Sequence, residues 1–231
     1  MSKRLDGKVA VIIGAGCVGP GWGNGRATAF RFVEEGASVL AVDNSEEALL
    51  ETIERVAPLD GVMETYIGDA TKSQSVASMI AACMSRFGRL DILVNNVGGS
   101  KKGGPVDLSE EDWDSQIDQN LKSVFLGCKY AIPELEKDGG GAIVNIASTS
   151  GTRWTGSAQV AYAATKAGVI QLSKVVAMEY ASKKIRVNAI APGQLHTPMV
   201  EARLAGQRTG GDVETLLRQR LARIPLGFMG D

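Results

Sequence analysis

An apolar run leads into a glycine-rich loop in the stretch Val9-Ala10-Val11-Ile12-Ile13-Gly14-Ala15-Gly16-Cys17-Val18-Gly19-Pro20-Gly21-Trp22-Gly23-Asn24-Gly25-Arg26-Ala27. The apolar run predicts a buried strand. A proline and three glycines fall within residues 19–23, so we expect a loop there and a helix that begins at Asn24 or Gly25 and ends near Glu35. The stretch therefore predicts a strand, an expanded loop and a helix.

The same alternation of apolar runs and amphipathic segments continues along the chain. It predicts strands at residues 9–13, 38–43, 62–67, 92–95, 142–147 and 186–191. Helices are expected at residues 25–35, 45–56, 73–87, 110–135 and 159–181, with Asn44 or Ser45 capping the second. Strands that are apolar throughout and separated by helices indicate a parallel sheet with helices on both faces. We predict an α/β doubly wound, Rossmann-type fold in a single domain, residues 1–231, with its ligand at the carboxyl ends of the strands.

The glycine loop is a candidate phosphate site. The glycines at positions 14, 16 and 19 match the spacing of the dinucleotide-binding fingerprint. The fingerprint places its last glycine inside a helix, which the proline after Gly19 does not permit. A helix N-terminus with free amides would instead face a pyrophosphate. The better candidates are the first glycine and the residues at the helix start, Gly14, Gly23, Asn24 and Gly25. A flexible turn without a ligand is the alternative.

Two aspartates follow predicted strands. Asp43 ends the second strand, where a carboxylate can accept both ribose hydroxyls of an adenosine. It would repel the 2′-phosphate of NADP, and no arginine follows to neutralise it, so the sequence favours NAD. Asp69, with Ala70 beside it, follows the third strand and is a candidate for contact with the adenine amino group. Helix capping is the alternative for either aspartate.

Further polar and glycine-rich segments reach the same edge of the predicted sheet. Amides and glycines close the fourth strand and allow a cofactor to lie against the backbone, which makes candidates of Asn96, Val97 and Gly98. The sixth strand ends in a turn at Pro192-Gly193, and Thr197 follows closely enough to cover a nicotinamide.

Asn120 lies mid-helix, where asparagine is mildly unfavourable, which indicates a specific role. His196 is expected to face solvent.

A tyrosine, a lysine and a serine form a candidate proton-transfer site. Tyr162 and Lys166 are four residues apart and therefore project from one face of a helix. Ser148 lies just past the apolar run of the fifth predicted strand. A strand end that brings a hydroxyl towards such a helix is suited to proton transfer. The alternative is a tyrosine and a lysine that only solubilise an exposed helix face.

Composition argues against several classes of function. The 231 residues are 44 % hydrophobic and 22 % charged with a formal net charge of −1, so we expect neither a nucleic-acid nor a membrane partner. No apolar run is long enough to span a bilayer, and the N-terminal sequence does not resemble a secretory signal. Cys17, Cys83 and Cys128 lack metal-ligand spacing and are expected to be free thiols, which indicates a cytoplasmic protein and no metal site.

Together these motifs resemble the short-chain dehydrogenase/reductase family. The similarity extends from Gly7 to Gly227 and rests on Gly14, Gly23-Asn24-Gly25, Asp69, Asn95-Asn96-Val97-Gly98, Asn120, Ser148, Tyr162-Ala163-Ala164-Thr165-Lys166 and Pro192-Gly193. The resemblance implies that Tyr162 is the general acid/base, that Ser148 steadies the substrate oxygen and that Lys166 holds the nicotinamide ribose. Asn120 would anchor a water that links Lys166 to solvent.

The implied chemistry requires a more acidic tyrosine. A free phenol has a pKa near ~10. We expect Lys166 and the positively charged nicotinamide ring to lower the pKa of Tyr162. Tyr162 would then take the hydroxyl proton of an alcohol while hydride passes to NAD.

The chain departs from the family pattern in two regions. Its glycine loop is longer, as in the enoyl-acyl-carrier reductases of the same superfamily, and Ile13 replaces the usual threonine. Those reductases space their tyrosine and lysine more widely than Tyr162 and Lys166, which disfavours enoyl reduction. The family also normally continues through another helix and a last strand, so we expect a sheet without its seventh strand.

We expect the substrate to bind beside residues 194–222. The predicted lining is Gly99–Lys102, Thr149, Ser150, Arg153, Trp154, Gln194 and Met199–Arg208. This mixed set favours a secondary alcohol or ketone, with an anionic substrate as the less favoured reading. The rival functions are a 3-oxoacyl thioester reductase, which would ordinarily use NADPH, and a non-catalytic dinucleotide-binding regulator. The family's usual assembly implies a homo-oligomer, a dimer or tetramer, that pairs helices 110–135 and 159–181.

Overall fold

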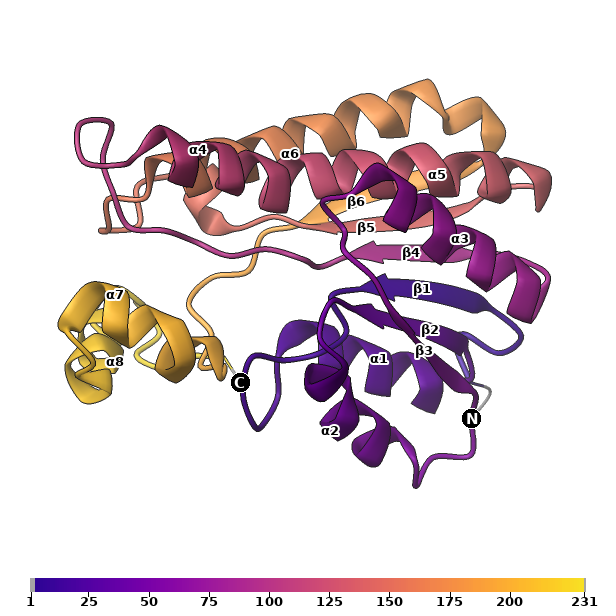
Figure 1. Cartoon of the computed structure of the whole chain (residues 1–231), viewed down its shortest axis with the longest axis horizontal. Helices are drawn as coiled ribbons and strands as arrows, with labels where there is room; N and C mark the ends of the chain where they lie inside the picture. The colour runs from indigo at the N-terminus through magenta and orange to yellow at the C-terminus, as the bar shows by residue number, and fades with distance from the viewer. Residues whose placement is uncertain (1–2, 231) are drawn as a thin grey trace.

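Six parallel strands form one sheet in the order β3-β2-β1-β4-β5-β6 (Figure 1). The structure is a computed structural model and describes residues 3–230. Its strands are β1 (Val9–Ile13), β2 (Ser38–Asp43), β3 (Met63–Ile67), β4 (Ile92–Asn95), β5 (Gly141–Ile146) and β6 (Ile185–Ile190). The strand order reverses between β1 and β4, which confirms the doubly wound fold.

Eight α-helices accompany the strands in the described residues: α1 (Asn24–Glu34), α2 (Glu46–Val56), α3 (Ser73–Phe87), α4 (Glu110–Ile117), α5 (Ser123–Lys137), α6 (Val160–Glu179), α7 (Ala205–Thr209) and α8 (Val213–Leu221). The predicted cap of α2 is Ser45, whose hydroxyl accepts from the Ala48 amide at 3.1 Å. The start of α1 at Asn24 also agrees with the prediction.

The central strands are buried on both faces because their side chains alternate between two cores. Val11 and Ile13 pack into the core formed with α3, α5 and α6. Ala10 and Ile12 pack into the core formed with α1 and α2. This coverage explains why β1 is apolar throughout. At β6, in contrast, Ile190 is exposed on the face away from α5 and α6.

The long helix predicted over residues 110–135 is confirmed as one uninterrupted helical run, but it is not α-helical throughout. A π-helical turn, Asp118–Lys122, joins α4 to α5. Asn120 lies within this turn and is fully buried, with its side chain hydrogen-bonded to the backbone of Gly99. A polar side chain that bonds to a neighbouring strand end favours such a local widening of the helix.

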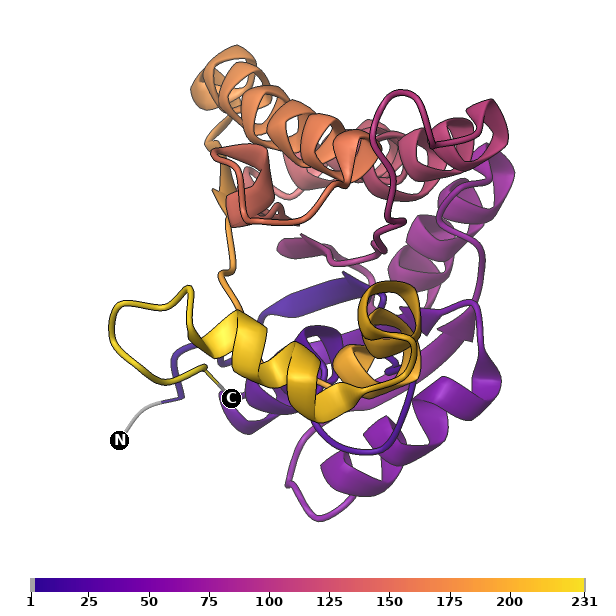
Figure 2. The ribbon, with the colours of Figure 1, turned by 90° about the vertical axis from the view of Figure 1, so that its left-hand side faces the viewer.

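The segment after β6 lies apart from the layers of the sheet, beside the carboxyl ends of the strands (Figures 1 and 2). Its helices α7 and α8 share a small apolar cluster of Val200, Ala205 and Leu216. Residues 194–222, expected to border the substrate, thus form a helical element over that end of the sheet. Within residues 3–230, no helix combines the length and the apolar character needed to cross a bilayer.

Candidate active site

A cavity of about 1130 Å³ runs along the carboxyl ends of the strands. It is lined by every residue predicted for coenzyme binding or catalysis except Asn120: Gly14, Gly23, Asn24, Gly25, Asp43, Asp69, Ala70, Asn96, Val97, Gly98, Ser148, Tyr162, Lys166, Pro192, Gly193 and Thr197. Asn120 lies next to the cavity and bonds to Gly99, which lines it. The fold therefore gathers residues that are up to 183 positions apart in the sequence.

Close backbone packing places the start of α1 along this cavity, between Asp43 and Asp69 at the ends of β2 and β3 and Ser148 past the end of β5. A Cβ atom on Gly25 would lie 1.8 Å from the carbonyl oxygen of Gly14, so only glycine fits there. Gly14 itself has a φ of 88°, a conformation that favours glycine. Gly23 is the N-cap and provides no side-chain hydrogen bond, so the first turn of α1 keeps free N–H groups. This arrangement can bind a phosphate.

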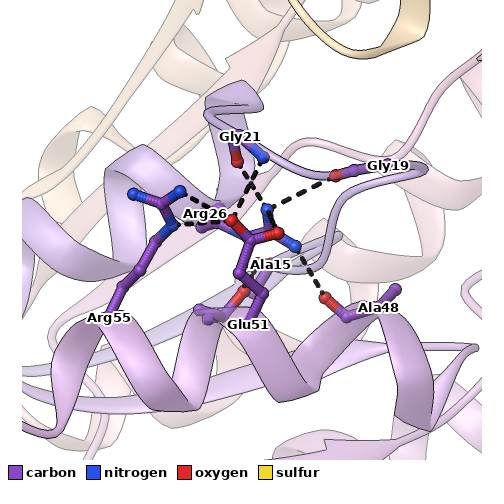
Figure 3. Close-up of polar contacts among 8 residues, drawn as sticks. Ala15, Gly19, Gly21, Arg26, Ala48, Glu51 and Arg55 are labelled. Atoms are coloured by element: carbon purple, nitrogen blue, oxygen red, sulfur yellow. Dashed lines mark hydrogen bonds and ion pairs between the residues drawn. The ribbon is translucent and has the colours of Figure 1, made fainter.

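The expanded loop is held by a buried arginine on α1 (Figure 3). Arg26 is only 1 % exposed and forms an ion pair with Glu51 of α2. Its guanidinium group also donates to the carbonyl oxygens of Gly19, Gly21 and Ala48 and to the Thr52 hydroxyl. Glu51 in turn accepts from the Gly21 amide at 3.1 Å. The loop is thus bonded to both α1 and α2.

Trp22 packs on the outer side of the same loop. The guanidinium carbon of Arg55 lies 4.3 Å from the centroid of its ring, and Phe30 meets the ring edge-on at 5.3 Å between centroids. Trp22 does not line the cavity. Trp22 therefore contacts α1 and α2, whereas Gly19 and Pro20 of the same loop line the cavity.

The two predicted aspartates both line the cavity and both accept backbone amides. The Asp43 carboxylate accepts from the Gly16 amide at 3.0 Å and from the Ser45 amide at 3.2 Å. Asp69 accepts from the backbone and the hydroxyl of Thr71, at 2.8 and 2.7 Å. These bonds fix the carboxylates at the ends of β2 and β3 and are compatible with further acceptance from a ligand.

Asn120 ties the π-helical turn to the segment after β4. Its Oδ1 accepts from the Gly99 amide at 2.9 Å, and its Nδ2 donates to the Gly99 carbonyl at 3.0 Å. A Cβ atom on Gly98 would lie 2.9 Å from Asn120 Oδ1 and 3.1 Å from Lys166 Nζ, so a side chain there would crowd both residues. Asn120 therefore positions the backbone beside Lys166. Its suggested role in holding a water stays a prediction.

Ser148, Tyr162 and Lys166 meet in the same cavity, past the end of β5. Lys166 Nζ donates to the Ile146 carbonyl at 2.6 Å and lies 5.8 Å from the centroid of the Tyr162 ring, so both side chains share one face of α6, as predicted. The turn after Ser148 packs tightly on α6, because a Cβ atom on Gly151 would lie 2.6 Å from the Ala167 amide. The end of β5 and the helix α6 are thereby held together.

Burial controls the acidity of these groups. It raises the pKa of Tyr162 above its usual value, although Ser148 and the charges of Arg208 and Arg220 act in the opposite direction. Burial also lowers the pKa of Lys166 to about 8. Lys166 is not among the groups that lower the pKa of Tyr162 in the chain by itself, and the lowering expected from Lys166 together with the nicotinamide ring stays a prediction. The cations that favour the phenolate come from the segment after β6.

Comparisons with known proteins identify the family. The family model described as short chain dehydrogenase matches residues 8–208. The chain is 38 % identical to the 3-oxoacyl-[acyl-carrier-protein] reductase FabG of Thermotoga maritima over 98 % of this chain and 86 % of that protein. The chain belongs to the short-chain dehydrogenase/reductase family. It is therefore an oxidoreductase.

Solved structures of family members have the same fold. A putative short-chain dehydrogenase/reductase from Burkholderia xenovorans superposes with a TM-score of 0.95 at 58 % identity, covering 99 % of this chain and 86 % of that one. The NAD+-bound xylitol dehydrogenase superposes with a TM-score of 0.88 at 28 % identity, covering 99 % of this chain and 89 % of that one.

A buried row of hydrogen bonds between β4, β5 and α6 supports the active site of this short-chain dehydrogenase/reductase. Asn95 on β4 donates to Asn145 on β5 at 2.8 Å, and Asn145 donates to the Ser173 hydroxyl on α6 at 2.9 Å. All three residues are at most 4 % exposed. These bonds fix α6, which carries Tyr162 and Lys166, against the strands. The strand pattern alone did not indicate that Asn145 and Ser173 meet.

Part of the predicted substrate lining is wrong. Nine predicted residues do not line the cavity: Lys101, Lys102, Arg153, Trp154, Val200, Glu201, Ala205, Gly206 and Gln207. Lys101 pairs with Asp112 at 3.1 Å, and Trp154 is 74 % exposed. The prediction missed Gln159 and Arg220, which do line the cavity. Arg220 comes from α8, a helix that the sequence pattern did not resolve.

His196, Cys83 and Cys128 lie outside the cavity, whereas Cys17 lines it beside the glycine loop. His196 is exposed and pairs with Glu201 at 2.8 Å, as expected of a solvent-facing histidine. The three cysteines are free thiols, and burial raises the pKa of Cys83 and of Cys128 to about 12. In the part of the chain that the structure describes, no three His, Cys, Asp or Glu side chains gather as a metal site would require.

Proposed function

We propose that this enzyme transfers hydride between NAD(H) and a secondary alcohol or ketone, with Tyr162 as the general acid/base. The observation that carries the proposal is one cavity lined both by the free N–H groups of α1 and by Ser148, Tyr162 and Lys166. The start of α1 suits a phosphate, and the three side chains suit proton transfer.

The cavity fits a dinucleotide along its length. Gly14 and Gly25 let the first turn of α1 pack closely against the end of β1, so its free N–H groups line the cavity, and Asp43 supplies a carboxylate for ribose hydroxyls. Bound there, NAD(H) would accept or donate the hydride. We propose that the remaining contacts come from the ends of the strands and the start of α1: Gly23, Asn24, Asp69, Ala70, Asn96, Val97, Gly98, Pro192, Gly193 and Thr197.

Two observations support NAD over NADP. Asp43 lies where a 2′-phosphate would meet a negative charge. The buried arginine of the adjacent loop, Arg26, is already paired with Glu51 and with backbone carbonyls, so it is not free to bind a phosphate. The similarity to the NAD+-bound xylitol dehydrogenase agrees with this choice.

Tyr162 and Ser148 act on the substrate oxygen in this proposal. In the reduction of a ketone, the neutral phenol of Tyr162 donates its proton to the carbonyl oxygen while Ser148 stabilises that oxygen through its hydroxyl. Because burial raises the pKa of Tyr162, the proton is in place at neutral pH. Oxidation of an alcohol requires the phenolate and is therefore favoured at higher pH.

Lys166 positions the nicotinamide half of the coenzyme. Its ammonium group donates one hydrogen bond to the Ile146 carbonyl and has two further N–H groups for the ribose. Asn120 supports this geometry by fixing Gly99 next to Gly98, which borders Lys166 Nζ. Tyr162 and Ser148 thus act on the substrate oxygen, and Lys166 and Asn120 serve the coenzyme.

A second candidate is the reduction of a 3-oxoacyl thioester. The similarity to the reductase of Thermotoga maritima favours it. Asp43 opposes it, because such reductases ordinarily use NADPH. An assay that pairs each coenzyme with each substrate class separates the two candidates.

The test is a screen of secondary alcohols with NAD or NADP, followed by NADH or NADPH fluorescence. The proposal predicts turnover with NAD and with at least one secondary alcohol. A protein that binds neither coenzyme would contradict it. Turnover of a 3-oxoacyl thioester with NADPH alone would establish the second candidate.

We also propose a homo-oligomer that pairs α5 and α6 with the same helices of a second copy. Phe125 on α5 and Val175 and Met178 on α6 are 51 %, 52 % and 80 % exposed, an unusual apolar surface for two adjacent helices. Light scattering that gives the mass of a monomer at micromolar concentration would contradict this arrangement.

A further inference from the structure

Two arginines line the substrate half of the cavity beside Tyr162. Arg208 lies in α7, and Arg220 lies near the end of α8. We propose that they bind a carboxylate on the substrate, so that the enzyme acts on a hydroxy acid or the corresponding oxo acid. This inference rests on the proposed function and narrows its substrate class.

Arg220 is buried with hydrogen-bonding capacity left over. It is 7 % exposed, and one terminal nitrogen donates to the Leu195 carbonyl at 3.0 Å. Its Nε is buried and has no hydrogen-bond partner. A guanidinium group carries five N–H donors, and a buried donor without an acceptor is costly. An oxyanion in the cavity would supply the acceptor.

Arg208 is bonded to the polar wall of the same cavity. It donates to Gln159 Oε1 at 2.9 Å, and Gln159 donates to the Ser150 hydroxyl at 2.7 Å. The guanidinium group is thereby oriented by a neutral side chain and keeps its charge unpaired. Among the ion pairs of residues 3–230, none includes Arg208 or Arg220.

Arg26 shows what a structural buried arginine looks like in this protein. It is paired with Glu51 and donates to three backbone carbonyls and one hydroxyl. Arg220 is nearly as buried but has one carbonyl partner and no carboxylate. The contrast indicates that the partner of Arg208 and Arg220 is a ligand.

The charges in this region are of one sign. Burial and the neighbouring charges of Arg208 and Arg223 lower the pKa of Arg220 to about 10. Like charges this close to one another favour an anion between them. A carboxylate matches guanidinium geometry and can accept from both side chains. Both arginines also act on the pKa of Tyr162, so the anion would bind close to the reacting group.

A buried acceptor in the same cavity fits the same ligand. Gln194 Oε1 is buried without a hydrogen-bond partner and lines the cavity. Gln194 Oε1 could accept from the hydroxyl of a hydroxy acid. The unpaired guanidinium groups, not Gln194, are what call for a carboxylate.

The test compares short 2- and 3-hydroxy acids with their methyl esters, which keep the alcohol and lose the charge. We expect kcat/KM with NAD to be at least ~tenfold higher for the best acid than for its ester. In Arg208→Gln and Arg220→Gln, KM for the acid should rise at least ~tenfold while KM for the ester changes little. Arg218→Gln, on the exposed side of α8, is the matched control and should leave both unchanged.

A second measurement covers the case in which the variants fold poorly. Butanoate should inhibit oxidation of the ester competitively in the unaltered enzyme. Equal kcat/KM for acids and esters, without inhibition by butanoate, would overturn the inference while leaving the oxidoreductase proposal intact. Failure of NADH binding, measured by fluorescence, would instead contradict the proposed function itself.

Discussion

The Lys166 ammonium group lies 2.6 Å from the Ile146 carbonyl oxygen, so the last residue of β5 fixes a side chain of α6. The contact turns Lys166 inward, where it is 2 % exposed and reaches Gly98 at the end of β4. On most helices this lysine would be solvated. Here its ammonium group lies between the end of β5 and the segment after β4, 5.8 Å from the centroid of the Tyr162 ring.

The first prediction concerns the proton donor. Tyr162→Phe removes the phenolic hydroxyl and keeps the ring, so kcat should fall by about 10²–10⁴ while the Kd for NADH stays within roughly twofold. Stopped-flow turnover and NADH fluorescence measure the two quantities. Tyr180→Phe, at the other end of α6 and outside the cavity, is the control. Unaltered turnover in Tyr162→Phe would remove the proposed acid/base.

The second prediction is a pH dependence of stability. Burial lowers the pKa of Lys166 to about 8, so between about pH 8 and pH 10 the unfolded chain binds more protons than the folded one. Stability therefore rises with pH across this window, because the cost of the buried charge is present below it and is relieved above it. Lys166→Met should be more stable than the parent at pH 7 by roughly 1–3 kcal/mol.

Urea unfolding at about pH 7 and about pH 9.5 tests this sign, since the gain from Lys166→Met should shrink at the higher pH. Lys174→Met, exposed on the same helix, should show no such pH-dependent gain. A gain that grows with pH is the opposite of what burial of the ammonium group requires.

The sequence was sufficient for the sheet and for most of the site, because both depend on local patterns. Apolar runs mark strands, and the residues just past Ile13, Asp43 and Asn95 must meet at one edge of a parallel sheet. The π-helical turn at Asn120 was not predicted, since the local sequence does not show that this side chain bonds to Gly99, 21 positions away. The position of Arg220 likewise depends on how α8 packs.

Coenzyme choice gives the third prediction. Asp43→Asn keeps the shape and the acceptor of the side chain but removes its charge, so the ratio of the Kd for NADPH to the Kd for NADH should fall by at least ~tenfold. Fluorescence titration of both coenzymes measures this ratio. A parent enzyme that already prefers NADPH would contradict the argument from Asp43.

The fourth prediction concerns the buried row of hydrogen bonds between β4, β5 and α6. Asn145→Ala leaves the Asn95 amide without its acceptor and removes the donor to Ser173, both in a buried setting. Leaving such groups unpaired costs about 1–3 kcal/mol, which urea unfolding can resolve. Asn188→Ala on the neighbouring strand β6 is exposed and should cost much less. If both variants lost the same free energy of unfolding, the hydrogen bonds that link Asn95, Asn145 and Ser173 would make no specific contribution to stability.

The last prediction concerns the expanded loop and separates its ordering from catalysis. Arg26→Met deletes the donor that holds the Gly19 and Gly21 carbonyls and leaves Glu51 without its buried partner. Leaving a buried charge uncompensated costs about 3–5 kcal/mol, but Glu51 is 26 % exposed and keeps Arg55 at 2.6 Å, so we expect a loss smaller than that range. A loosened loop no longer supports the start of α1, so the Kd for NADH should rise more than kcat falls.

Arg31→Met, on the exposed face of α1, controls for the loss of an arginine. If Arg26→Met instead lowers kcat at saturating NADH and leaves the Kd unchanged, the loop acts on the chemical step and not on coenzyme binding.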